Sequence, residues 1–162
     1  MISFIKRQFG AYESKTQIYL ILFGVLLKFG LGLYFLTSSE IVLNYLSVSS
    51  LVLEANLNPY YGELQHSNPF PYPSIILYLL VSLVWIAEYF DLNTLIFSTS
   101  LLSIIFIIFD LITLRVMSNW VGKHNKTQLL ILYWLSPVLI YLSFISGSFD
   151  VLVLCLFFLG LD

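Results

Sequence analysis

The chain has 162 residues, of which 59% are hydrophobic and only 10% are charged, and its net charge is −2 at neutral pH. A soluble domain carries about 25% charged residues, so this composition excludes an ordinary soluble domain and predicts a surface that faces lipid. The weak negative charge gives no reason to expect nucleic acid as a partner.

The first predicted element is an apolar run at about 17–36, which follows Lys6, Arg7 and Lys15. The charge order resembles that of a signal peptide. However, the run is longer than a signal h-region of about 7–15 residues, and no small-residue cleavage site follows it. We therefore expect a retained membrane helix. It carries one charge, Lys28, roughly 18 Å into the helix at 1.5 Å per residue.

The next segment, residues 41–57, mixes apolar residues with serine and asparagine. Its apolar residues recur at near-helical spacing, which predicts an amphipathic helix lying at the membrane interface. The residues that set this spacing are Val42, Leu46, Leu53 and Leu57.

A polar, aromatic stretch, NPYYGELQHSNPFPYP at 58–73, completes the predicted first outer loop, residues 37–73. Proline fixes φ and biases the preceding residue toward extended backbone, so the stretch is expected to be stiff. Its aromatic rings either form an interfacial belt or make a rigid wall that stacks on sugar rings or isoprene units. The candidate substrate-binding residues here are Asn58, Pro59, Tyr60, Tyr61, His66, Tyr72 and Pro73.

Residues 75–90 form a shorter apolar run, closed by Glu88 and Asp91. Its clean apolar part, IILYLLVSLVWIA, falls short of the roughly 20 residues that a spanning helix needs. We expect this run to re-enter the membrane or lie at its outer interface. The alternative is that it spans with some tilt.

Basic residues predict the orientation. Between Lys28 and Arg115 there is no lysine or arginine, and the clusters on either side should both be cytoplasmic. An even number of crossings must then separate the clusters, which favours spans at 17–36, 94–117 and 128–142. This predicts an all-α, multi-pass integral membrane protein with a cytoplasmic N-terminus. In the alternative topology, 75–90 also spans, and Lys123 and Lys126 lie outside.

The run at 94–117 contains a second intramembrane charge, Asp110. Such charges are costly and usually face the protein interior. A pair with Lys28 is within reach, and that would give the lysine a structural role. Asp110 can equally pair with Arg115 or bind a backbone amide at a helix break.

The last run, 151–161, is too short to cross, which suggests that residues 1–162 are a single membrane domain from the N-terminal part of a larger protein. It follows ISGSFD, which contains Gly147 and Asp150. If 128–142 runs outward, Asp150 lies on the same side as 58–73. There it can orient a phosphate or a metal, or cap the following helix. The lone Cys155 forms no disulfide within the chain.

The order of these motifs resembles the N-terminal part of the GT-C superfamily of integral membrane glycosyltransferases, which includes mannosyltransferases. The matching motifs, spread in order over about 17–162, are EANLNPYYG, PFPYPS, FDLITLR, GKHNK and LSPVLIYLSFISGSFD. The resemblance implies sugar transfer from a polyprenyl-phosphate donor at the outer face, with membrane lipids as further partners. Family members place the catalytic carboxylate in the first outer loop. This chain has Glu40 there, in TSSEIVLNY, where aspartate is usual, so Glu40 is the implied general base.

Two other functions remain open on the sequence. The chain can be a non-catalytic or accessory subunit that packs against a larger membrane enzyme. It can also be a carrier of lipid-linked substrates, with Lys28 and Asp110 lining the path. No nucleotide, haem or zinc motif is present. The one cofactor candidate is a divalent metal that bridges phosphates.

Overall fold

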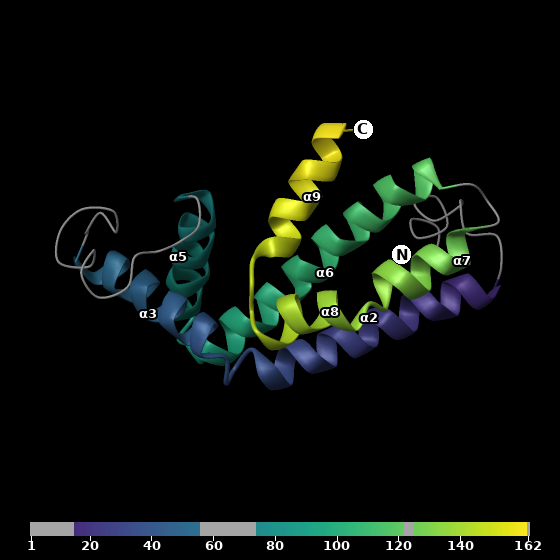
Figure 1. Ribbon diagram of the computed structural model, residues 1–162. Coiled ribbons are helices and arrows are strands. Elements are labelled where there is room, and N and C mark those ends of the chain that lie inside the picture. Colours follow the sequence, from purple (N-terminus) through teal and green to yellow (C-terminus); the bar gives the residue numbers. More distant parts are fainter. Residues whose placement is uncertain (1–14, 56–73, 122–124, 162) are drawn as a thin grey trace.

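The computed structural model describes residues 15–55, 74–121 and 125–161, and every regular element within these ranges is helical (Figure 1). The longer helices are α2 (Lys15–Phe35), α3 (Glu40–Ala55), α5 (Ser74–Tyr89), α6 (Thr94–Trp120) and α9 (Asp150–Leu161). Between α6 and α9 lie α7 (Lys126–Leu129), η2 (Leu130–Trp134), α8 (Pro137–Ile140) and η3 (Tyr141–Ile145), where η marks a π-helix. The all-α prediction is confirmed for these residues.

Within the part of the chain that the structure describes, three segments are long and apolar enough to cross a membrane, namely Lys15–Phe35, Thr94–Trp120 and Lys126–Ile145. They coincide with the three predicted crossings. The helices α5 and α9 have 16 and 12 residues, shorter than these segments. The chain is therefore an all-α, polytopic membrane protein.

The helices α2 and α6 lie side by side and run in opposite directions. Lys28 of α2 pairs with Asp110 of α6, whereas Gly32, further along α2, lies against Ser103, which is earlier in α6. The connection from 36 to 93 therefore begins and ends at the same end of this pair. This is the arrangement expected when an even number of crossings separates the two basic clusters, and the membrane topology itself stays a prediction.

The segment 126–145 runs parallel to α2. At one end, the Gln17 side-chain amide donates a hydrogen bond to the Thr127 hydroxyl at 3.1 Å. At the other end, the Ser39 hydroxyl donates to the Ser146 carbonyl at 2.7 Å. We call the first the Lys15 end of the bundle and the second the Ser39 end. The helix α9 then runs back along α6, with Phe158 packed near Trp120 at a ring separation of 5.5 Å.

The helices α3 and α5 pack on each other at the Ser39 end, beside the start of α6 (Figure 1). The periodicity that predicted α3 is confirmed, because Val42 and Leu46 are buried and Leu53 is half-buried. Leu57 lies outside the described residues.

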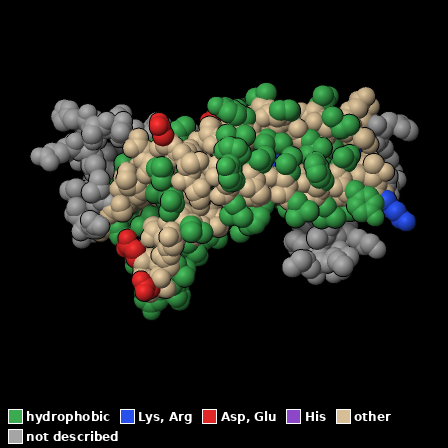
Figure 2. Space-filling view, turned by 90° about the horizontal axis from the view of Figure 1, so that it is seen from below, with side chains coloured by type: hydrophobic (Ala, Val, Ile, Leu, Met, Phe, Trp, Pro, Cys, Tyr) green, Lys and Arg blue, Asp and Glu red, His purple; other side chains and the backbone are tan. Residues whose placement is uncertain are grey.

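The core of the spanning segments is more polar than their outside. The buried stripe of α2 consists of Ile21, Gly24, Lys28 and Gly32, whereas Tyr19, Phe23 and Leu26 are exposed. Figure 2 shows a broad apolar surface along the length of the bundle. Small and polar residues inside with large apolar residues outside are what lipid as a solvent favours, because apolar side chains gain little by leaving it.

The opposed directions of α2 and α6 predict a labelling pattern. With single cysteines at Lys15, Ser38 and Asn119, a membrane-impermeant maleimide should reach Lys15→Cys and Asn119→Cys from one side and Ser38→Cys from the other. The buried native Cys155 should stay unlabelled in folded protein. Labelling of positions 38 and 119 from the same side would contradict the antiparallel arrangement.

Candidate functional site

A buried ion pair joins α2 to α6 in the middle of the bundle. The Lys28 ammonium contacts Oδ2 of Asp110, and the two side chains are 0% and 3% exposed. The Tyr133 hydroxyl donates to Oδ1 of the same carboxylate at 2.6 Å. Both carboxylate oxygens are therefore engaged. Of the alternatives left open for Asp110, the structure shows the pairing with Lys28.

Aromatic rings surround the lysine. Its ammonium lies 3.4 Å from the centroid of the Trp134 ring and 5.8 Å from that of Phe144. A cation over the face of an indole is stabilised by the negative face of the ring, by about 2 kcal/mol when the contact is desolvated. The buried charge network, which we define as Lys28, Asp110, Tyr133 and Trp134, thus links α2, α6 and η2.

Two features of the backbone create room for this network. A Cβ atom at Gly24, one turn before Lys28, would collide with the Trp134 indole. Only glycine therefore lets the ring lie against α2. The π-turn of η2 carries an extra residue, seen in the bond from the Leu135 N–H to the Leu130 carbonyl at 3.0 Å. The neighbours Tyr133 and Trp134 are both buried in this turn. Such π-bulges often occur at functional sites.

The buried charge network is closed to solvent in this structure. Lys28 is fully buried, and its ammonium is held by a carboxylate and an aromatic face. Such an arrangement suits a structural link between helices better than it suits a binding surface. The carrier function would require this pair to line a path, and here each partner faces the other.

A second cluster lies at the Ser39 end, where the turn between α2 and α3 meets the turn before α9. Ser39 donates to the Ser146 carbonyl, and its oxygen also accepts the Val42 N–H at 3.5 Å. Gly147 has a φ of +79°, and an added Cβ would collide with Val42. A left-handed backbone and the absence of a side chain are both needed here, so the packed corner explains the glycine.

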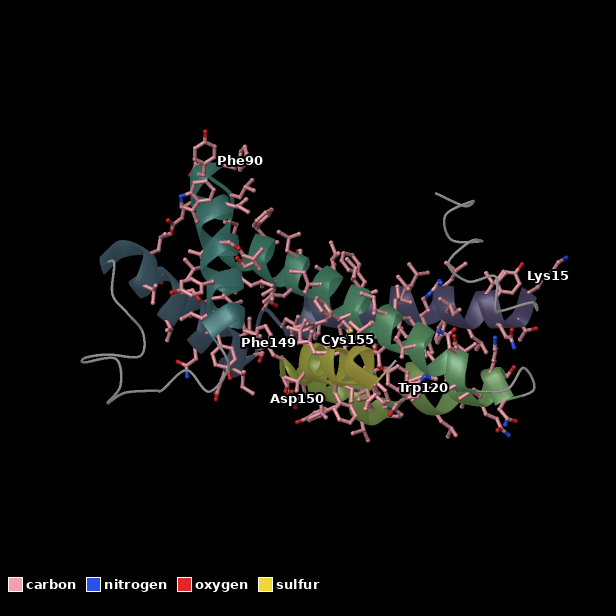
Figure 3. All side chains as sticks on the ribbon, turned by 90° about the horizontal axis from the view of Figure 1, so that it is seen from above. Lys15, Phe90, Trp120, Phe149, Asp150 and Cys155 are labelled. Atoms are coloured by element: carbon pink, nitrogen blue, oxygen red, sulfur yellow. The ribbon has the colours of Figure 1, made fainter. Side chains whose placement is uncertain are left out.

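The two acids proposed for chemistry flank this corner. Glu40 is the first residue of α3, Asp150 is the first residue of α9, and both are exposed. A carboxylate in the first turn is favoured by the helix dipole. The Asp150 backbone N–H donates to the Ser148 hydroxyl at 3.4 Å, so Ser148 also contributes to capping the start of α9. Figure 3 shows Asp150 beside Phe149 at the start of α9.

The remaining predicted residues are Arg115 and those of the connector. Arg115 lies on α6, five residues beyond Asp110, and is exposed. The predicted binding residues of the connector lie outside the described residues, namely Asn58, Pro59, Tyr60, Tyr61, His66, Tyr72 and Pro73. The structure also adds Tyr133 and Trp134, which sequence reasoning missed. The signal in the sequence was Gly24, four residues before Lys28, because a residue without a side chain leaves room for a large ring.

Over the described ranges, no three His, Cys, Asp or Glu side chains gather where they could hold a metal ion. The divalent metal suggested by the sequence would need only one or two carboxylates besides the phosphates that it bridges, so it stays a prediction. No family model, no curated protein and no solved structure matches this chain.

Proposed function

We propose that this chain transfers a sugar from a polyprenyl-phosphate donor at the Ser39 end of the bundle, as a GT-C-like glycosyltransferase. The observation that carries the proposal is the contact between Ser39 and Ser146 at 2.7 Å. It brings the turns that precede Glu40 and Asp150 together, although more than 100 residues separate them in sequence. Two exposed carboxylates then begin helices at the same end of a membrane bundle.

Charge distribution supports an outer location for this end. Lys15 and Lys126 lie next to the hydrogen-bonded pair Gln17 and Thr127, at the Lys15 end. On the face shown in Figure 2, the acidic side chains lie toward the end with α3 and α5, and the basic side chains lie at the opposite end. Lysine and arginine are enriched on the cytoplasmic side, so we place the N-terminus there and Glu40 outside.

The proposed reaction divides the work between the two acids. Glu40 accepts the proton of an acceptor hydroxyl as its oxygen attacks the anomeric carbon of the donor sugar. The bond from that carbon to the phosphate oxygen breaks, and polyprenyl phosphate leaves with the bonding electron pair. Asp150 accepts hydrogen bonds from sugar hydroxyls and orients the donor. Both carboxylates are exposed, so a substrate can reach them.

The test is sugar transfer in membranes that contain the chain and a polyprenyl-phosphate-mannose donor. The substitution Glu40→Gln keeps the shape of the side chain but removes the base, and transfer is expected to fall about 100-fold or more. The matched control, Asp91→Asn, removes another exposed acid at the α5–α6 turn and should leave transfer unchanged.

Undiminished transfer by Glu40→Gln would remove Glu40 from the mechanism. Absence of transfer by the unsubstituted chain would favour the accessory-subunit function instead.

A further inference from the structure

An open surface cavity of about 320 Å³ lies between α3, α5 and the start of α6, apart from Glu40 and Asp150. Its volume is at the lower end of the range for small-molecule pockets, about 300–1,000 Å³. The residues that line it are Leu43, Leu46, Ser47, Ser50, Glu88, Thr94 and Leu95. One wall is thus apolar, and the polar wall contains a single ionisable side chain.

Three of the four polar side chains that line this cavity, all except Thr94, are arranged to accept hydrogen bonds. The Ser47 hydroxyl donates its proton to the Asn44 carbonyl at 2.7 Å, and the Ser50 hydroxyl donates to the Ser47 carbonyl at 2.9 Å. The oxygen lone pairs of both serines remain as acceptors, and the Glu88 carboxylate can only accept. The described lining contains no lysine, arginine or histidine. The cavity therefore suits a ligand that donates hydrogen bonds and carries a positive charge.

The neighbouring aromatic residues indicate the level of this cavity in the membrane. Trp85 and Tyr89 are exposed and stack at a ring separation of 5.6 Å, and Phe90 packs edge-on against Tyr89. Figure 3 shows Phe90 projecting from the end of α5. Exposed tryptophan and tyrosine favour the level of the lipid headgroups. Glu88 is in the same helical turn, which places the acid of the cavity at headgroup level.

We propose that this cavity binds the protonated amine of an aminophospholipid such as phosphatidylethanolamine. Glu88 pairs with the ammonium, and the oxygens of Ser47 and Ser50 accept its N–H groups. Leu43 and Leu46 contact the glycerol and the upper part of the acyl chains. The site does not depend on sugar transfer, because neither Glu40 nor Asp150 lines it.

The experiment measures lipid retention by native mass spectrometry of the whole chain in detergent. Phosphatidylethanolamine is compared with phosphatidylcholine, whose headgroup has the same charges but no N–H donor, and with anionic phosphatidylglycerol. Phosphatidylethanolamine should be retained about tenfold better than either, since a hydrogen bond between charged groups is worth about that factor or more. Glu88→Gln should remove this preference, and Asp91→Asn should keep it.

A second variant fills the cavity without touching the acid. Ser47 is exposed, so Ser47→Phe should fold and should also abolish the preference for phosphatidylethanolamine. Equal retention of the three lipids, or equal behaviour of Glu88→Gln and Asp91→Asn, would overturn the proposal. Binding of free dodecylamine without retention of phosphatidylethanolamine would overturn it too, because the occupant would then be a soluble amine.

Discussion

The substitution Asp110→Leu is expected to lower the free energy of unfolding by about 3–5 kcal/mol, because it leaves the Lys28 ammonium buried without its counter-ion. The cost arises from the charge that remains and not from the contact that is lost. The double variant Lys28→Met with Asp110→Leu removes both charges and should recover most of this loss. Unfolding midpoints in detergent micelles would measure both effects.

A milder variant, Tyr133→Phe, tests the rest of the buried charge network. Tyr133→Phe removes one hydrogen bond to Asp110 but no charge, and it should cost about 1 kcal/mol. Asp91→Asn, at the exposed turn before α6, should leave the midpoint unchanged. A double variant no more stable than Asp110→Leu alone would show that the ion pair does not carry this energy, and the proposed role of the pair would be wrong.

Gly24→Ala should destabilise the protein by about 1–3 kcal/mol, because the added methyl group meets the Trp134 indole. The ring would have to move from its place under Lys28, so the overpacking would also weaken the contact between the cation and the ring. The measurement is again the unfolding midpoint in micelles.

Gly30→Ala provides the matched control on the same helix. Nothing lies within 4 Å of a Cβ built at Gly30, so this change should be neutral or should stabilise α2 by up to about 1 kcal/mol through helix propensity. Equal effects of the two substitutions would mean that Trp134 does not pack on α2 as described.

The pairing of Lys28 with Asp110 shows how far one-dimensional reasoning can reach. Both residues belong to regular helices, so a rise of 1.5 Å per residue estimates their depths and brings them within reach. Two rival partners for Asp110 stayed open, since depth along the membrane normal says nothing about which helices are neighbours. The contact between Ser39 and Ser146 likewise joins segments that no local pattern connects.

The sequence by itself determined the membrane class, the three apolar spans and the helix predicted at 41–57, which the structure has at Glu40–Ala55. Hydropathy and periodicity are local properties of the chain, so they can be judged without knowing which segments are neighbours. Only the tertiary structure decided that α2 and α6 are antiparallel and that Gly24 makes room for Trp134. It also decided that a π-turn buries Tyr133 and Trp134 together. These features depend on which helix faces meet, and a face is chosen by packing between segments far apart in the chain.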